Sequence, residues 1–234
     1  MITIKIWSDF ACPYCYIGEK RLNDAIKELG WSDKFEIIYK AFELDPGAAK
    51  VTEGSVAERL AKKYNLGLGE ARQKIDSIDA QGREAGIDMR FGTTRSSNTL
   101  DAHRLMKLAE ARYDGETVSK LNEILFSDYF TKNLVLSDHS VLLEAAVSAG
   151  IKEEDAKETL NSDAYEADVR KDESEAAAMG VHGVPYIVFH DKYAVPGALS
   201  IDDFKSVLRQ VFDEVSKLDI TERAKSCDET GCTI

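Results

Sequence analysis

Two cysteines separated by two residues carry the clearest chemistry in this chain. They form the segment Cys12-Pro13-Tyr14-Cys15, which follows a short apolar stretch and opens a run with helical spacing. A thiol at a helix N-terminus lies at the positive end of the helix macrodipole, which favours the thiolate. Pro13 suits the first helical turn, because a residue there needs no backbone N–H donor. The pattern predicts a redox pair in which Cys12 attacks a disulfide and Cys15 resolves the mixed disulfide.

A C-x-x-C pair can also supply half of a zinc site, which needs two further ligands. The remaining cysteines, Cys227 and Cys232, lie near the C-terminus with four residues between them. A four-cysteine zinc site would therefore hold the end of the chain over a helix start. We favour the redox interpretation and expect no metal and no bound cofactor. Cys227 and Cys232 are interpreted as a secondary redox pair that exchanges with Cys12 and Cys15, with a passive terminus as the alternative.

The composition of the chain restricts its size class and its partners. At 234 residues with 44% hydrophobic residues, it can form one large domain or a domain with an insertion. Its formal net charge of −12 argues against nucleic acid or an anionic membrane as the main partner. The apolar N-terminal stretch is only as long as a strand, and no run approaches the length of a membrane span. We expect a cytoplasmic protein, monomeric or homodimeric, that uses its thiols chemically.

The predicted elements begin with a β-α-β unit. Alternating apolar residues predict strands over 2–8 and 35–42, and helical spacing predicts a helix over 13–29 between them. Such a unit favours parallel strands joined by a right-handed crossover. The following candidate helices cover residues 68–85, 98–113, 118–129, 140–149, 155–160 and 162–179. Ser55 and Glu58 have the spacing of a capping box, which marks one more helix start.

The last predicted elements are two strands and a closing helix. An apolar strand ends at Phe189, residues 192–195 form its partner, and residues 201–218 form an amphipathic helix. This order predicts an α/β protein with a thioredoxin-like fold that carries a large helical insertion. The predicted domains are a discontinuous thioredoxin-like domain over 1–47 and 162–218, a helical insertion domain over 48–161, and a flexible tail over 219–234 with the second cysteine pair.

Four segments of the chain resemble one family. These are Ser8-Asp9-Phe10-Ala11-Cys12-Pro13-Tyr14-Cys15-Tyr16-Ile17-Gly18, Asn98-Thr99-Leu100-Asp101-Ala102-His103-Arg104, Gly180-Val181-His182-Gly183-Val184-Pro185-Tyr186 and Tyr193-Ala194-Val195-Pro196-Gly197-Ala198. Together they resemble the DsbA-like superfamily, and most of all its cytosolic FrnE-like branch, although many relatives have Ser or Thr in place of Pro196. The resemblance spans about residues 1–215. It implies a thiol-disulfide oxidoreductase that acts on protein or small-molecule disulfides.

The resemblance also implies how substrates would be held. It assigns a cis peptide bond to Val184–Pro185, beside the cysteines, which would let the Val184 backbone pair with an extended peptide. The candidate substrate-binding residues are Pro13, Tyr14, Val184, Pro185, His182 and Asn98. His182 would stabilise a Cys12 thiolate, whereas Asn98 would either reach the cleft or cap a helix. His103 is interpreted as a packed or surface residue.

Two other functions remain open from the sequence. Kappa-class glutathione transferases and chromene-carboxylate isomerases share the superfamily fold, but they look to have serine where Cys12 stands and to lack the second cysteine. A non-catalytic protein that binds a partner through the helical insertion is the third alternative. Turnover of a disulfide without glutathione distinguishes an oxidoreductase from these transferases and isomerases. An unreactive Cys12 favours the partner-binding protein.

Overall fold

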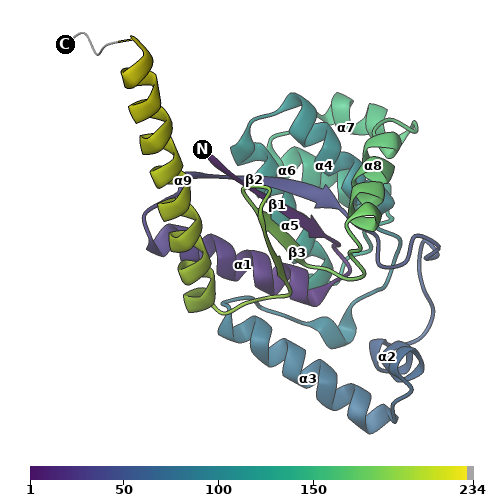
Figure 1. Cartoon of the computed structure of the whole chain (residues 1–234). Coiled ribbons are helices and arrows are strands. Elements are labelled where there is room, and N and C mark those ends of the chain that lie inside the picture. The colour runs from purple at the N-terminus through teal and green to yellow at the C-terminus, as the bar shows by residue number, and fades with distance from the viewer. Residues whose placement is uncertain (231–234) are drawn as a thin grey trace.

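The computed structural model of the chain describes the backbone of residues 1–230 and the side chains of residues 1–217. A sheet of four strands forms the centre of this described part (Figure 1). The strands lie in the order β2-β1-β3-β4, with β1 at Ile2–Ser8, β2 at Phe35–Ala41, β3 at Tyr186–Phe189 and β4 at Tyr193–Pro196. β1 and β2 are parallel, whereas β3 is antiparallel to both of its neighbours. The parallel β-α-β unit predicted from the sequence is thereby confirmed.

Different helices cover the two faces of the sheet. α1 (Pro13–Glu28) and α9 (Ile201–Thr230) contact each other and share one apolar cluster with β1, β2 and β3. Successive side chains of a strand point to opposite faces. Trp7 and Val188 accordingly lie on the other face, where they pack against Ala176 of α8 (Glu166–Ala178). Trp7 is 2% exposed, so it belongs to the core on this face of the sheet.

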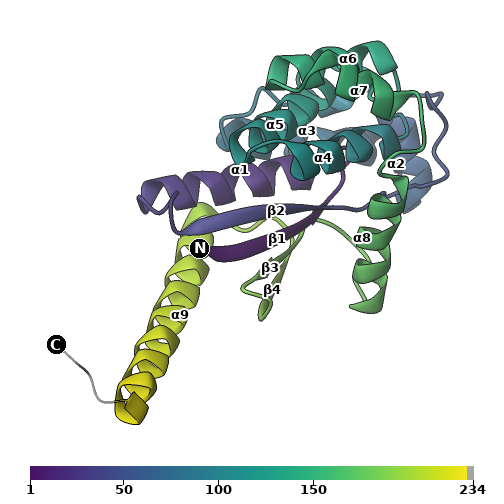
Figure 2. The same ribbon diagram turned by 90° about the horizontal axis from the view of Figure 1, so that it is seen from above.

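The segment between β2 and β3 is helical, as the sequence predicts. Besides α8, its helices are α2 (Val56–Tyr64), α3 (Leu68–Glu84), the 3-10 turn η1 (Phe91–Thr93), α4 (Leu100–Arg112), α5 (Gly115–Phe130), α6 (His139–Ala149) and α7 (Glu153–Leu160). The capping box is present, because Ser55 and Glu58 each accept a hydrogen bond from the other's backbone N–H. Figure 2 shows α3 to α7 gathered on the side of α1 that faces away from the sheet. One large apolar cluster joins these helices to α1.

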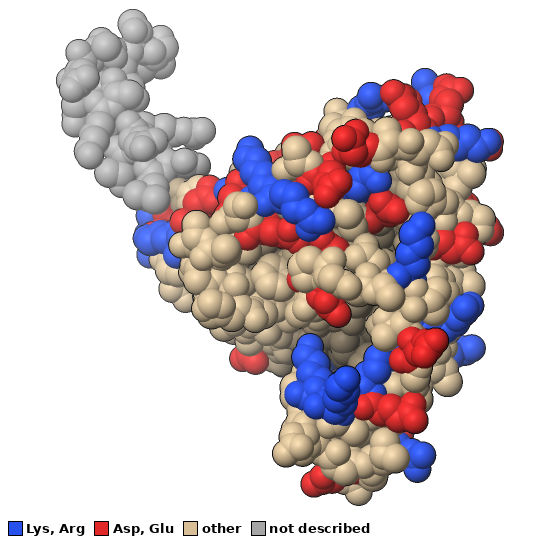
Figure 3. Space-filling view, turned by 90° about the vertical axis from the view of Figure 1, so that its right-hand side faces the viewer, with Lys and Arg blue, Asp and Glu red and all other residues tan. Residues whose placement is uncertain are grey.

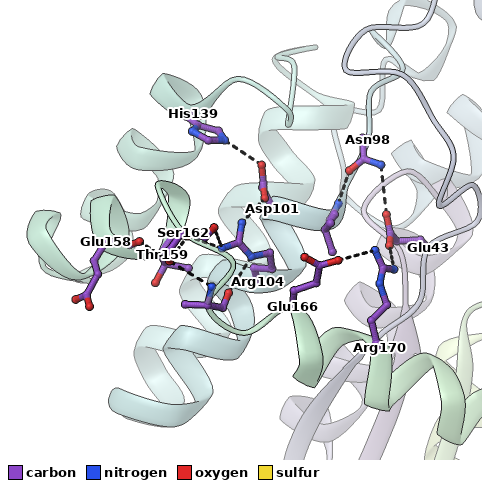
Figure 4. A network of polar contacts seen from close by, with 12 residues as sticks. Glu43, Asn98, Asp101, Arg104, His139, Glu158, Thr159, Ser162, Glu166 and Arg170 are labelled. Carbon is purple, nitrogen blue, oxygen red and sulfur yellow. Dashed lines mark hydrogen bonds and ion pairs between the residues drawn. The ribbon is translucent and has the colours of Figure 1, made fainter.

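α8 begins later than the sequence predicts, at Glu166 rather than at Ser162. Tyr165, directly before it, has a φ of 64°, so the backbone is left-handed there and not helical. Arg104 of α4 explains this break, because its guanidinium donates hydrogen bonds to the carbonyls of Thr159 and Ser162 (Figure 4). The turn between α7 and α8 is thus wrapped around one buried side chain.

α9 is longer than the sequence prediction, which ended this helix at Leu218. In the structure it continues to Thr230, so the predicted helix end at Leu218 comes too early, and the predicted flexibility of the C-terminal segment stays a prediction. The physical reason is that the chain has no glycine or proline between Ile201 and Thr230, and Gly231 is the next residue that favours a helix end. Figure 1 shows α9 projecting away from the body of the molecule.

Candidate active site

Cys12 and Cys15 lie after β1, at the start of α1. Cys12 is the N-cap residue of α1, with extended backbone angles, and Pro13 is the first helical residue. No side chain makes a capping hydrogen bond to the first turn, and the Cys12 thiol, at the N-cap position, lies at the positive end of the helix macrodipole. The two cysteines are free thiols, of which Cys12 is 5% exposed and Cys15 is fully buried. Cys12 is therefore the more accessible of the two, in the order that the sequence predicts.

The loop before β3 closes the site on the other side of Cys12. The Val184–Pro185 peptide bond is cis, as the resemblance implies. The Cys12 thiol donates a hydrogen bond to the Val184 carbonyl, with 3.5 Å between Sγ and O. α1 comes very near to this loop, since a Cβ on Gly18 would lie 3.4 Å from Cγ of Pro185. The tighter contact of such a Cβ would be with Cβ of Ala198, at 3.2 Å, so the absence of a side chain at Gly18 chiefly accommodates the segment after β4.

The surroundings of Cys15 differ from those of Cys12. Burial, and next the neighbouring Cys12 thiol, raise the pKa of Cys15 well above its usual range. The Ser8 hydroxyl and a backbone group of Asp9 make hydrogen bonds that oppose this rise in pKa. Cys15 is consequently a neutral thiol at neutral pH, and it must lose its proton before it can attack a disulfide.

A buried glutamate lies beneath this thiol. Glu19 of α1 accepts a hydrogen bond from the Ser8 hydroxyl at 2.6 Å and another from the Asn122 amide of α5 at 2.6 Å. Its exposed fraction is 2%, and this burial raises the pKa of Glu19 to about 7, although both hydrogen bonds act in the opposite direction. The carboxyl group therefore titrates near neutral pH.

A second buried acid holds the loop that leads into the cysteines. Asp9 accepts hydrogen bonds from the backbone N–H groups of Ala11 and Leu44, at 3.1 and 2.7 Å. Nε2 of His103 lies 3.6 Å from Oδ1 of Asp9, beyond hydrogen-bond range, and has no partner among the described residues. The Phe10 ring covers the imidazole, with centroids 5.0 Å apart. His103 and Phe10 are thus both buried, and His103 takes the packed of the two positions considered for it.

The comparisons with known proteins agree with this geometry. A family model described as a DSBA-like thioredoxin domain matches residues 3–209. The crystal structure of a probable DsbA oxidoreductase from Streptomyces coelicolor is 34% identical, covers 92% of this chain and 91% of its own, and has a TM-score of 0.84. The chain belongs to the DSBA-like thioredoxin domain family. The predicted fold class, a thioredoxin-like fold with added helices, is confirmed for this DSBA-like chain.

More distant structures share the DSBA-like fold. A 2-hydroxychromene-2-carboxylate isomerase is 15% identical, with 92% of this chain and 98% of its own covered and a TM-score of 0.69. The cytosolic disulfide reductase DsbM from Pseudomonas aeruginosa, solved with glutathione, is also 15% identical, with 90% and 99% covered and a TM-score of 0.58. At such identities the likeness concerns the fold alone. Within the described residues of the DSBA-like chain, no helix is long and apolar enough to cross a bilayer.

The other predicted site residues lie at different distances from the thiols. Tyr14 is 36% exposed directly beside Cys12. His182 is exposed and shares a pocket of about 410 Å³ with Val184 and Pro185, whose lining residues do not include Cys12. No hydrogen bond or ion pair joins His182 to Cys12 within the described part of the chain, so its proposed effect on the thiolate stays a prediction.

Asn98 is held at the start of α4 rather than at the cysteines. Its side-chain oxygen accepts the backbone N–H of Leu100 at 2.9 Å, and its amide donates to Glu43 at 3.4 Å. Glu43 is itself paired with Arg170 of α8 at 2.5 Å (Figure 4). Asn98 thus contacts the first turn of α4 from the position before the N-cap, because the N-cap residue itself is Thr99.

A zinc site was one alternative for the cysteines. Among them no group of three or more His, Cys, Asp or Glu side chains could hold a metal ion. Cys232 and the side chain of Cys227 lie outside the described residues, and their predicted redox role stays a prediction.

Sequence reasoning missed the polar groups beneath Cys15. Glu19 lies four residues after Cys15 and three before Leu22, so it belongs to the buried stripe of α1. A charged residue on an otherwise apolar stripe was the available signal for Glu19. The positions of Ser8 and Asn122 had no comparable signal, because they come from β1 and α5.

Proposed function

We propose that this protein is a thiol-disulfide oxidoreductase of the FrnE-like branch, with Cys12 as the nucleophile and Cys15 as the resolving thiol. One observation carries the proposal. Cys12 is the N-cap residue of α1, and its thiol sulfur lies 3.5 Å from the carbonyl oxygen of Val184, directly before the cis Pro185. This arrangement places the less buried of the two sulfurs beside backbone groups that can pair with a peptide.

The exchange has two steps. The Cys12 thiolate attacks one sulfur of a substrate disulfide, which forms a mixed disulfide and releases the other sulfur as a thiolate. Cys15 then loses its proton and attacks Cys12, which releases the remaining substrate sulfur and leaves a Cys12–Cys15 disulfide. The protein dithiol loses two electrons and the substrate disulfide gains them. The opposite sequence oxidises a substrate dithiol, and the two directions use the same residues.

The proposed substrates are protein disulfides or small thiol and disulfide molecules. The candidate contacts around Cys12 are Pro13, Tyr14, Val184, Pro185 and His182. DsbM, which shares the fold, has been solved with glutathione. Figure 3 shows the side of the molecule toward which β1 points, where the surface is hollowed above a projecting lobe and basic side chains gather at the hollow. A cytoplasmic location, in which cellular thiols recycle the dithiol, completes this proposal.

We also propose that Cys227 and Cys232 form a secondary redox pair that recycles Cys12 and Cys15. The spacing of the two cysteines supports this role. Replacing both by serine should leave the formation of the mixed disulfide at Cys12 unchanged and alter only the rate at which the dithiol is regenerated by limiting reductant. An unchanged regeneration rate would contradict it.

The test of the main proposal uses the purified full chain and a fluorescent peptide disulfide. Cys12→Ser should abolish turnover. Cys15→Ser should accumulate a covalent adduct at Cys12, seen as added peptide mass on intact protein. Turnover that survives in Cys12→Ser would overturn the assignment. Glutathione-dependent isomerisation or conjugation without disulfide turnover would instead support an isomerase or transferase, and slow alkylation of Cys12 would support a non-catalytic binding protein.

A further inference from the structure

Positive charge without a paired counter-charge is concentrated on the lobe that α2 and the start of α3 form. In residues 50–74, called the basic lobe below, Lys and Arg outnumber Asp and Glu, although the whole chain has a formal net charge of −12. By contrast, Lys5, Lys132 and Arg170 elsewhere are each paired with a carboxylate. Among the described side chains, no ion pair involves the cations of the basic lobe, which are Lys50, Arg59, Lys62, Lys63, Arg72 and Lys74.

Carboxylates of the basic lobe are held on backbone groups instead. Glu58 accepts the backbone N–H of Ser55 at 2.7 Å in the capping box of α2, and Glu70 accepts that of Gly67 at 2.8 Å at the start of α3. A carboxylate in this position is stabilised by the hydrogen bond and by the positive end of the helix macrodipole. These acidic side chains therefore stabilise helix starts and leave the neighbouring cations without an ion pair.

Apolar side chains are exposed between these cations. Tyr64 is 51% exposed and Leu68 is 48% exposed. The ammonium groups of Lys63 and Lys74 lie 5.9 and 5.4 Å from the centroid of the Tyr64 ring. Contact with a partner removes such apolar surface from water, and the ammonium groups attract negative charge. A ligand that suits both features carries apolar side chains and carboxylates together.

The basic lobe borders the face of the molecule that holds the cysteines. The segment between β2 and α2 connects the two, because the backbone N–H of Leu44 donates to Asp9 at 2.7 Å and that of Thr52 donates to the Ser96 carbonyl at 2.8 Å. The Leu44 side chain is exposed, so apolar surface begins beside the loop that leads into Cys12. Figure 3 shows the lobe projecting below the hollow of this face, with basic side chains gathered where the lobe meets the hollow. A polypeptide whose disulfide reacts at Cys12 therefore reaches the lobe by crossing the hollow.

We propose, as an extension of the oxidoreductase function proposed above, that the basic lobe binds an acidic segment with interspersed apolar residues in the protein substrate. Cys12 then reacts preferentially with disulfides that lie beside such a segment. Exposed charges act on an oppositely charged ligand mainly through the rate of association, and salt screens this effect. A preference for acidic substrates that disappears at high salt is therefore the expected signature of the lobe.

The experiment compares two peptides that differ only in charge. Each carries one cysteine as a mixed disulfide with 2-thiopyridine, followed by three Glu-Leu repeats or three Ser-Leu repeats. The Cys12 thiolate attacks the peptide sulfur, a mixed disulfide of protein and peptide forms, and 2-thiopyridone leaves with the electron pair of the broken bond. With the reduced chain carrying Cys227→Ser and Cys232→Ser at about 20 mM salt, we expect the rate constant for the Glu-Leu peptide to exceed that for the Ser-Leu peptide by at least about tenfold. At about 0.5 M salt the ratio should approach one.

Two triple variants of this parent chain have the same change in net charge at different places. The first changes three lysines of the basic lobe and should bring the ratio of the two rate constants close to one: Lys62→Ser, Lys63→Ser and Lys74→Ser. The second is the matched control and should keep the ratio of the parent chain. It changes three exposed lysines outside the lobe that likewise form no ion pair within the described part of the chain: Lys27→Ser, Lys120→Ser and Lys152→Ser.

Binding without chemistry provides a second measurement. Fluorescence anisotropy follows a labelled peptide of Glu-Leu repeats that has no cysteine. The triple variant of the basic lobe should bind this peptide at least about tenfold more weakly than the parent chain, whereas the control variant should bind it equally well. Tighter binding of a single-stranded thymidine oligonucleotide, lost with the same three lysines, would assign the lobe to nucleic acid and overturn the proposal.

The outcomes distinguish this inference from the proposed function. A ratio near one in the parent chain at low salt, or an equal fall of the ratio in both triple variants, overturns the role of the basic lobe. If the parent chain releases no 2-thiopyridone, or if Cys12→Ser releases it at the same rate, the oxidoreductase proposal itself fails. The anisotropy measurement then still decides whether the lobe binds an acidic segment.

Discussion

Two buried carboxylates in this molecule have opposite electrostatic surroundings. Asp172 of α8 lies at the β2 edge of the sheet, 2.7 Å from the Lys40 ammonium and 2.6 Å from that of Lys107. Burial opposes its ionisation, but the charges of the two lysines outweigh burial and hold the pKa of Asp172 below its usual range. Glu19 is buried as deeply but meets only neutral donors, so its pKa rises to about 7. Similar exclusion from solvent therefore leaves an anion at neutral pH in one region and a group that titrates near neutral pH in the other.

This difference separates a carboxylate with a structural role from one that titrates. Asp172 also accepts the backbone N–H of Ala41 at 3.0 Å, and its own backbone carbonyl accepts the indole N–H of Trp7. It thus ties α8 to the sheet. Glu19 instead accepts hydrogen bonds from the Ser8 hydroxyl and the Asn122 amide, at 2.6 Å each, and titrates near neutral pH.

The largest expected effect is the loss of the ion pairs at the sheet edge. Asp172→Ala leaves Lys107 buried without this counter-charge, and we expect the free energy of unfolding to fall by roughly 3–5 kcal/mol. Urea denaturation at pH 7 measures this change, with Asp88→Ala, which breaks an exposed pair with Arg90, as the control. Because the pKa of Asp172 is lowered in the folded chain, its contribution is present above pH 3.8 and is lost at more acidic pH. A loss below 1 kcal/mol at pH 7 would show that the stability of the folded chain does not depend on the buried ion pairs of Asp172.

Glu19 should give the opposite pH dependence. Its pKa is 4.5 in its usual state and about 7 in the folded chain, so the folded chain binds more protons in this interval and loses stability as the pH rises through it. Glu19→Gln cannot ionise, and relative to wild type it should gain about 3 kcal/mol between pH 4.5 and pH 8. Urea denaturation of both proteins across this range measures the difference. A pH-independent difference between them would contradict the titration of Glu19.

The smallest effect concerns the outer lysine of the sheet-edge cluster. Lys40 pairs with Asp172 and with Glu175, but its side chain is 15% exposed and Lys107 remains when it is removed. We expect Lys40→Met to reduce the free energy of unfolding by about 1 kcal/mol. Lys157→Met, which breaks an exposed pair on α7, is the control and should change it by about 0.3 kcal/mol. A loss as large as that of Asp172→Ala would mean that Lys107 alone does not compensate the carboxylate.

Much of the fold was predictable because its signals are local. Alternation over 2–8 and 35–42, the capping box at Ser55 and the apolar spacing of the later helices act within a few residues, and the structure contains these elements. The end of α9 was not predicted, although no glycine or proline interrupts the chain between Leu218 and Gly231.

By itself, the sequence determined that Cys12 and Cys15 stand at the start of a helix after a strand, because capping, periodicity and spacing depend only on neighbouring residues. The tertiary structure alone decided what surrounds them. Val184 comes 172 residues after Cys12, and Asn122 comes 103 residues after Glu19. Whether a buried carboxyl becomes a fixed anion or a proton acceptor depends on such distant partners, since desolvation and pairing are set by packing rather than by position along the chain.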